Sequence, residues 1–251
     1  MSAVTVDHAG SVAILTITNP PLNLVNAEVV EGLTGALERI EAARDVRAVV
    51  LTGEGSRAFC AGFDLGEMRD GSGAAEPGAD QRLFNAIQDL PAPVVAGIAG
   101  HCIGGGLELA LACDIRIAAE DATLCAAGVK VGLVVSTARI GSWISPAVAS
   151  DLVLTGRTID GREAERLNVV SRAVPSTDVL AESKAWAAMI AERAPLAVRE
   201  AKRAIRATVE TGFDQARSQE VSASARLTET EDHKRAVAAF LDRDPVRFTG
   251  Q

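Results

Sequence analysis

The most informative stretch of this 251-residue sequence is Gly104-Gly105-Gly106-Leu107-Glu108-Leu109-Ala110, shortly downstream of the apolar run Val94–Ile98. Three glycines at the expected start of a helix leave backbone N–H groups bare, and these groups have no partner within the helix. The helix dipole makes the same end attractive to negative charge. One turn further, Glu108 lies among apolar neighbours, where a carboxylate is either paired with a buried partner or held ready for proton transfer. The stretch therefore predicts part of an active site.

A structural interpretation of the same stretch stays open at this point. An ion pair between Glu108 and Arg116 or Arg139 would also satisfy a buried carboxylate. The glycines would then only allow close packing of the helix on a sheet. A second loop is needed to decide between the two interpretations.

That second loop runs Ser56-Arg57-Ala58-Phe59-Cys60-Ala61-Gly62-Phe63-Asp64-Leu65. It follows residues 46–51, whose β-branched side chains are typical of a buried parallel strand. Gly62 permits an unusual backbone angle, and a tight turn there can aim the N–H group of Phe63 into a cleft. Loops at the ends of neighbouring strands are where open α/β sheets bind ligands. One N–H group from each loop would form an oxyanion hole, a pair of amides that binds a negatively charged oxygen.

Together, the two loops resemble the crotonase (enoyl-CoA hydratase/isomerase) superfamily, and the resemblance covers essentially the whole chain. It rests on residues 58–65 and on the run Gly100-His101-Cys102-Ile103-Gly104-Gly105-Gly106-Leu107-Glu108-Leu109-Ala110-Leu111-Ala112-Cys113-Asp114. Further likenesses are Asn19-Pro20-Pro21 with Asn26-Ala27, Leu154-Thr155-Gly156-Arg157, and Phe240-Leu241-Asp242-Arg243. The resemblance implies an α/β crotonase fold, with repeated ββα units that form a spiral core holding an acyl-CoA site at residues 1–190. It also implies a C-terminal helical trimerisation region at residues 191–251, and hence a homotrimer or a dimer of trimers.

The resemblance also implies the roles of individual residues. The carbonyl oxygen of an acyl-CoA thioester would lie between the N–H groups of Phe63 and Gly105, and Glu108 would match the first of two catalytic glutamates. Coenzyme A is then part of the substrate, and no separate cofactor is expected. The residues expected to contact the substrate are Leu24, Arg57, Ala61, Gly62, Asp64, Leu65, Gly104 and Gly128.

The sequence departs from the hydratase pattern where the second glutamate is expected. Residues 124–128, Leu124-Cys125-Ala126-Ala127-Gly128, place Gly128 at that position. Because hydration needs one group to activate water and another to deliver a proton, efficient hydration is in doubt. Glu108 would then act alone in isomerisation, hydrolysis, decarboxylation or lyase chemistry. Asp64, Glu67 or Lys130 would otherwise substitute for the missing carboxylate, or the protein would bind acyl-CoA without rapid turnover.

Composition excludes other classes of protein. The net charge of −8 argues against a nucleic-acid partner. No apolar run approaches the ~20 residues that span a bilayer, and the first residues do not resemble a secretory signal. We therefore expect a cytoplasmic protein without a membrane partner. The cysteines Cys60, Cys102, Cys113 and Cys125 lack metal-ligand spacing, so we expect no metal site and small buried thiols.

Periodicity predicts the remaining elements. A hairpin is expected from residues 4–6 and 12–18, followed by a helix capped by Asn26. Helices are expected at 176–193, 195–210, 213–228 and 231–241. The glycine-rich segment 71–78 is expected to be a loop, either a lid over the acyl group or a plain surface loop.

Overall fold

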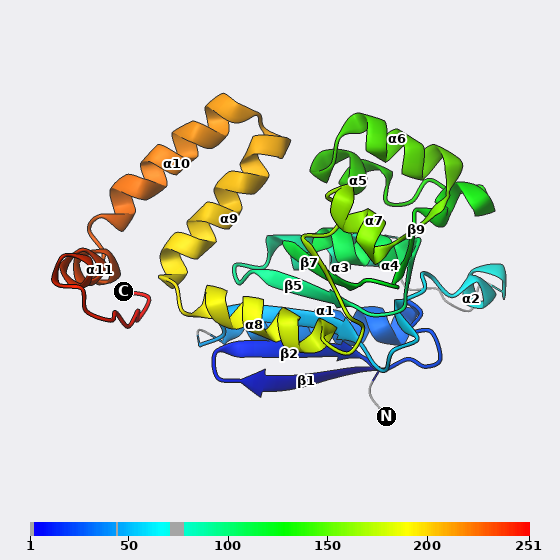
Figure 1. Ribbon diagram of the computed structural model, residues 1–251, viewed down its shortest axis with the longest axis horizontal. Coiled ribbons are helices and arrows are strands. Elements are labelled where there is room, and N and C mark those ends of the chain that lie inside the picture. The colour runs from blue at the N-terminus through cyan, green and yellow to red at the C-terminus, as the bar shows by residue number, and fades with distance from the viewer. Residues whose placement is uncertain (1–2, 44, 71–77) are drawn as a thin grey trace.

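Two sheets form the centre of the computed structural model, which describes residues 3–43, 45–70 and 78–251 (Figure 1). In the described chain the larger sheet has six strands in the order β1-β2-β3-β5-β7-β10, and the smaller has four in the order β4-β6-β8-β9. The β1–β2 pair is antiparallel, and the other neighbours in the larger sheet are parallel. The larger sheet consists of β1 (Val4–Ala9), β2 (Val12–Ile17), β3 (Ala48–Gly53), β5 (Val94–Ile98), β7 (Ile115–Ala119) and β10 (Arg172–Val174). The smaller sheet consists of β4 (Ala58–Cys60), β6 (His101–Ile103), β8 (Thr123–Cys125) and β9 (Thr158–Asp160).

The chain alternates between the sheets in the way that the ββα prediction requires. The first strand of each of three units, β3, β5 or β7, lies in the larger sheet, and the second, β4, β6 or β8, lies in the smaller one. Helices then return the chain toward the next unit, which confirms the predicted spiral of ββα repeats. These segments are α1 (Ala27–Ala42), α2 (Leu65–Asp70), α3 (Ala79–Asp89), α4 (Gly105–Ala112), the 3₁₀ turn η1 (Ala127–Val131), α5 (Thr137–Trp143), α6 (Pro146–Thr155) and α7 (Gly161–Arg166).

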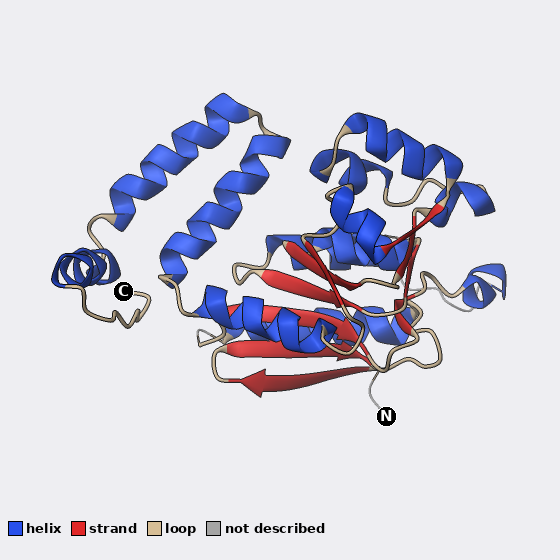
Figure 2. Ribbon diagram, viewed as in Figure 1, coloured by secondary structure: helices blue, strands red, loops and turns tan. Residues whose placement is uncertain are grey.

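Helices cover both faces of the larger sheet, as Figure 2 shows. On one face α8 (Val179–Ala191) packs Ala187 and Trp186 against Val50 and Val95. On the other face α1, α3 and α4 contribute to the main core, which includes Leu33, Phe84 and Leu109. The run Val94–Ile98 is buried at every position because it lies between these layers, as expected for a central parallel strand.

Three further helices, α9 (Pro195–Glu210), α10 (Phe213–Leu227) and α11 (Glu231–Asp242), extend away from the sheets (Figure 1). An ion pair with a buried lysine fixes α9 to the core: Lys202 Nζ lies 2.8 Å from Asp114 Oδ2, which also accepts the N–H of Val94. The chain end returns to α11, where Asp232 accepts the N–H groups of Thr249 and Gly250. The bounds predicted for α9 are correct, and those for α10 and α11 differ by one residue.

The structure tests several predicted element boundaries, and strand pairing moves one of them. The strand expected at 46–51 is observed as Ala48–Gly53, because its ladder with β2 runs from Val12–Ala48 to Ile17–Gly53. The loop expected at 56–65 contains the short strand β4. The cap expected at Asn26 is confirmed, since its side chain accepts the N–H of Val29 at 2.9 Å. The predicted loop at 71–78 lies outside the described residues except for Gly78, which precedes α3.

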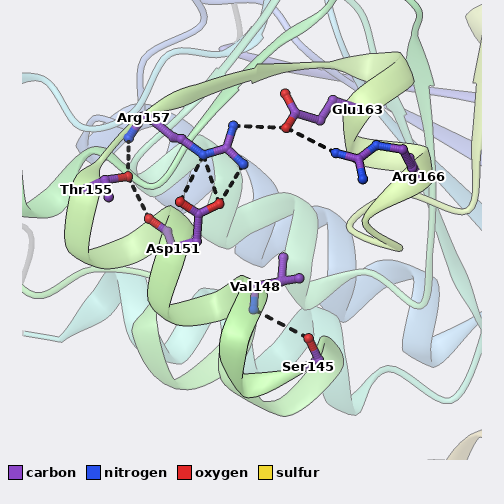
Figure 3. A network of polar contacts seen from close by, with 7 residues as sticks. All are labelled: Ser145, Val148, Asp151, Thr155, Arg157, Glu163 and Arg166. Carbon is purple, nitrogen blue, oxygen red and sulfur yellow. Dashed lines mark hydrogen bonds and ion pairs between the residues drawn. The ribbon is translucent and has the colours of Figure 1, made fainter.

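Figure 3 shows a polar network that holds the corner between α6 and α7. Arg157 contacts both carboxylate oxygens of Asp151 and also pairs with Glu163, which Arg166 approaches from the next turn. The hydrogen bond to Asp151 is the main reason that the pKa of Arg157 is raised. Both side chains of this pair are partly exposed. The corner includes Gly156, whose Cα faces the side chains of Lys130 and Val129 in η1. The network therefore supports the segment that contains Gly128.

Candidate functional site

The first glycine loop presents a free amide at Phe63. Gly62 has φ +104°, and its carbonyl accepts the N–H of Val25 at 2.8 Å. The N–H of Asp64 returns to the carbonyl of Val25 at 3.2 Å. Because successive amides of an extended chain point to opposite sides, the N–H of Phe63 points away from Val25. No described residue accepts from it.

The second glycine loop presents a free amide at Gly105. Gly104 caps α4 with φ +54°, donates its N–H to Cys125 at 2.9 Å and accepts the N–H of Glu108 at 3.0 Å. Gly105 is the first residue of α4, so its N–H group has no partner within the helix. No described residue outside α4 accepts from it either. The predicted helix start at the three glycines is confirmed.

Contact between the loops requires glycine at each approach. A Cβ atom on Gly62 would lie 2.9 Å from the carbonyl oxygen of Ile103 and 3.6 Å from the nitrogen of Gly105. A Cβ atom on Gly105 would lie 2.8 Å from the ring of Phe63, and one on Gly106 would overlap the carbonyl oxygen of Cys60. The two loops therefore touch, with the nitrogen of Gly105 close to Gly62 and the ring of Phe63 close to the Cα of Gly105.

Glu108 lies one turn into α4 with its side chain only 8% exposed. Among the described residues, two hydrogen-bond donors and one arginine charge reach its carboxylate. The Ser136 N–H lies 2.9 Å from Oε2, whereas Gln81 Nε2 and Arg139 Nε lie 3.3 and 3.5 Å from Oε1. Of the two arginines considered from the sequence, Arg139 is the partner. Arg116 instead donates to the carbonyls of Val169 and Cys113, both at 2.8 Å.

The position of the missing glutamate is filled by backbone. Gly128 is buried in η1, and a Cβ atom there would lie 2.7 Å from the carbonyl oxygen of Leu133 and 3.0 Å from the nitrogen of Val135. The segment 133–136 thus takes the space next to Gly128, and Ser136 at its end binds Glu108. Ser136 also donates its hydroxyl to the carbonyl of Gly104 at 3.1 Å.

The residues considered as substitutes for that glutamate have other contacts. Asp64 Oδ1 accepts the N–H groups of Gly66 and Glu67 at the start of α2. Lys130 Nζ lies 3.6 Å from the sulfur of Cys125. The Glu67 side chain has no interaction with another residue in the described part of the chain. Asp64 and Lys130 thus have structural partners in place of a contact with Glu108.

The remaining predicted substrate contacts surround the first loop. Leu24 is half-buried. Its neighbours Leu22 and Val25 form backbone hydrogen bonds with residues 61–64. Ala61 is half-buried, Leu65 is exposed, and Arg57 is exposed just before β4. The structure thus brings Leu24, Ala61, Gly62, Asp64 and Leu65 together, with Arg57 at the other end of the short strand β4.

The cysteines near the loops are buried and unreactive in character. Burial raises the pKa of Cys60 to about 12, despite the opposing effect of a backbone contact with Gly62. Burial likewise raises the pKa of Cys113 to about 12 and that of Cys102 well above its ordinary value. Within the described ranges, no group of three or more His, Cys, Asp or Glu side chains is arranged to hold a metal ion. No helix in the same ranges is long and apolar enough to cross a membrane.

Sequence reasoning missed Ser136 and Gln81, which both bind Glu108. They lie 28 and 27 residues from Glu108, so no local pattern connects them with it. The signal for Ser136 was indirect: the stretch after Gly128 departs in sequence from the hydratase pattern.

Comparisons with known proteins identify the family. Residues 7–251 match the family model described as enoyl-CoA hydratase/isomerase. A protein named probable enoyl-CoA hydratase from Bacillus subtilis is 34% identical over 261 residues, covering 100% of both chains. The short-chain-enoyl-CoA hydratase of Clostridium acetobutylicum is 31% identical, covering 98% of this chain and 97% of the relative. A crystal structure of an enoyl-CoA hydratase from Bacillus anthracis superimposes with a TM-score of 0.93 at 30% identity, covering 99% and 100% of the two chains.

The protein therefore belongs to the enoyl-CoA hydratase/isomerase family and has the crotonase fold.

Proposed function

We propose that this protein is an acyl-CoA enzyme that holds the thioester oxygen between the N–H groups of Phe63 and Gly105 and uses Glu108 as its acid/base. The observation that carries the proposal is the contact between two glycine loops, each presenting an amide that no described residue occupies. Glu108 lies one turn beyond Gly105. A fixed donor directed at the charge that develops on an enolate oxygen is worth about 3 kcal/mol in the transition state.

The missing second carboxylate limits the reaction. In a two-carboxylate hydration, one carboxylate activates water and the other delivers a proton. Here the backbone of residues 133–135 leaves no room for a side chain at Gly128. The names of the relatives favour hydration, whereas this packing favours an enolate reaction served by one base, such as isomerisation. Hydrolysis and decarboxylation are further reactions that Glu108 would serve as a single acid/base under this proposal.

Coenzyme A enters this proposal as part of the substrate. Arg57 is exposed just before β4 and suits a contact with a phosphate group, since guanidinium groups bind phosphate through paired N–H donors. Leu24 and Gly128 would line the path of the acyl-CoA. The proposal also includes a homotrimer that assembles through residues 191–251. It further places the protein in the cytoplasm and in fatty acid metabolism.

A second candidate function is acyl-CoA binding with little or no turnover. It is favoured by Gly128 and by the two hydrogen bonds and the ion pair that already engage Glu108. The Phe63 and Gly105 amides would serve binding as well as catalysis, so geometry alone does not separate the two candidates.

The test is turnover by the wild-type chain and by Glu108→Gln. Loss of the conjugated thioester absorbance of crotonyl-CoA and of 2-octenoyl-CoA reports hydration. Exchange of the α-protons of butyryl-CoA in deuterium oxide, followed by NMR, reports enolate formation alone. We expect exchange by the wild-type chain and a loss of about 100-fold or more in Glu108→Gln, with butyryl-CoA affinity unchanged in calorimetry. Tight binding without exchange would favour the binding protein, and turnover unaffected by the substitution would exclude Glu108 as the acid/base.

A further inference from the structure

Glu108 and Arg139 form an ion pair that is buried on both sides. The side chains are 8% and 10% exposed, and Arg139 Nε lies 3.5 Å from Glu108 Oε1. Nε has no hydrogen-bond partner among the described residues, so the contact with Glu108 is a charge interaction rather than a hydrogen bond. A buried pair with only a charge contact contributes little to stability, which raises the question of what else it does.

Helix α3 fixes the direction in which Arg139 points. Asn85 Oδ1 accepts from Nη2 at 2.6 Å, and Gln88 Oε1 accepts from Nη1. Asn85 and Gln88 are three residues apart on α3, so they present their carboxamides on one face of that helix. Because both carboxamides are neutral, they do not offset the positive charge that the Arg139 guanidinium presents to Glu108. Burial lowers the pKa of Arg139, whereas the charge of Glu108 opposes this effect.

The contacts of Glu108 restrict where a substrate proton can reach it. An ionised carboxylate offers about four acceptor sites. Ser136 and Gln81 donate to two of them, and the charge of Arg139 faces Oε1. Groups from α3 and α5 thereby hold the carboxylate in one orientation.

From this arrangement, which rests on the function proposed above, we propose that Arg139 is a positioning residue for the reaction. It orients Glu108 through the charge contact at Oε1. In Arg139→Ala the carboxylate loses the charge that faces Oε1, which is costly for a side chain only 8% exposed. Arg139 thus holds Glu108 in its working orientation.

The structure suggests a rescue experiment for this role. Arg139 and Glu108 both line a cavity of about 350 Å³, together with Asn85, Gln88 and Trp143. In Arg139→Ala, a guanidinium ion added at millimolar concentration can enter the space left by the side chain. Urea has a similar size and shape but no charge, so it serves as the control solute. The readout is α-proton exchange of butyryl-CoA, measured with its kcat and KM.

We expect Arg139→Ala to lower kcat about 100-fold, as misplaced catalytic groups do, with KM nearly unchanged. Guanidinium should restore at least a tenth of the lost rate, and urea should restore none. Arg139→Lys should be intermediate, because it keeps the charge but not the planar contacts with α3. Arg206→Ala is the matched control, since Arg206 lines the same cavity but pairs with Asp89 and Glu210. Its exchange rate should match that of the wild-type chain.

The other outcomes separate the two proposals. A normal exchange rate in Arg139→Ala, or a loss that guanidinium does not restore while thermal stability falls, would overturn the positioning role and leave the proposed function standing. A wild-type chain without exchange would overturn the proposed function, and the positioning role with it.

Discussion

At the scale of single residues, glycine is required where the two loops touch. A Cβ atom on Gly106 would overlap the carbonyl oxygen of Cys60 in β4, whereas Gly141 in α5 has open space around its Cα. We expect Gly106→Ala to lower the free energy of unfolding by about 1–3 kcal/mol through overpacking. Gly141→Ala should raise it by up to about 1 kcal/mol, because alanine favours a helix over glycine. Urea unfolding midpoints at an unchanged slope measure both effects.

Equal stability of the two alanine variants would contradict the contact between the loops. The same variants also test function, since Gly106→Ala displaces the Gly105 amide and should lower acyl-CoA turnover. Gly141→Ala should leave turnover unchanged.

Most of the candidate site could be read from local sequence, and the rest could not. Gly62 and Gly104 indicate turns, and Glu108 follows the glycines by one helical turn. The candidate roles of Phe63, Gly105 and Glu108 could therefore be predicted from the sequence. The donors to Glu108 could not be predicted in this way, because Gln81 and Ser136 approach it from α3 and from the start of α5. Arg139 could be named only as one of two alternatives, since side-chain direction depends on how α5 packs.

At the scale of elements, long helices could be predicted from the sequence better than short strands. The helices α9–α11 have 12 to 16 residues, and periodicity fixed their ends to within one residue. The helix expected at 176–193 was less accurate, since α8 begins three residues later, at Val179, and ends two residues earlier, at Ala191. The strands of the smaller sheet have three residues each, too few to show an alternating pattern. They exist because neighbouring backbones pair, which depends on the whole spiral rather than on their own side chains.

The chain end gives a pH-dependent prediction at this scale. Asp232 is buried, and burial alone would raise its pKa; the donors Thr249 and Gly250 and the charge of Arg235 outweigh this effect and lower it. A carboxyl group whose pKa is depressed by folding contributes stability above its unfolded pKa of about 3.9. That contribution is lost as pH falls through the folded value. We therefore expect the segment 249–251 to stay docked at neutral pH and to detach in stronger acid.

NMR shifts of the Thr249 and Gly250 amide protons, followed through an acid titration, check this. Asp232→Asn should shift both amides already at neutral pH, because the carboxylate that accepts them is gone. Asp242→Asn, an exposed carboxylate on the same helix, should leave them in place. Shifts in Asp232→Asn equal to those of the parent chain would show that the segment is held by other contacts.

At the scale of the whole molecule, the helices α9–α11 expose more apolar surface than a single copy of the chain explains. Phe240 and Leu241 are 83% and 73% exposed on α11, and Phe213 is 67% exposed on α10. Figure 1 shows these helices extending away from the sheets, where they have few neighbours within their own chain. Several large apolar side chains exposed on one set of helices favour an interaction surface there. Most soluble assemblies are closed symmetric oligomers of one chain, so we expect copies of the chain to cover these helices.

The expected assembly is a homotrimer, and Phe240→Asp tests it because buried aromatic anchors dominate interface energies, at about 2 kcal/mol or more each. Light scattering after size exclusion should give a trimer for the wild-type chain and smaller species for Phe240→Asp. Leu154→Asp is the matched control, since Leu154 on α6 is 74% exposed but lies outside the C-terminal helices. A wild-type monomer would contradict the trimer. Loss of assembly in Leu154→Asp but not in Phe240→Asp would place the interface on the α6 side of the molecule.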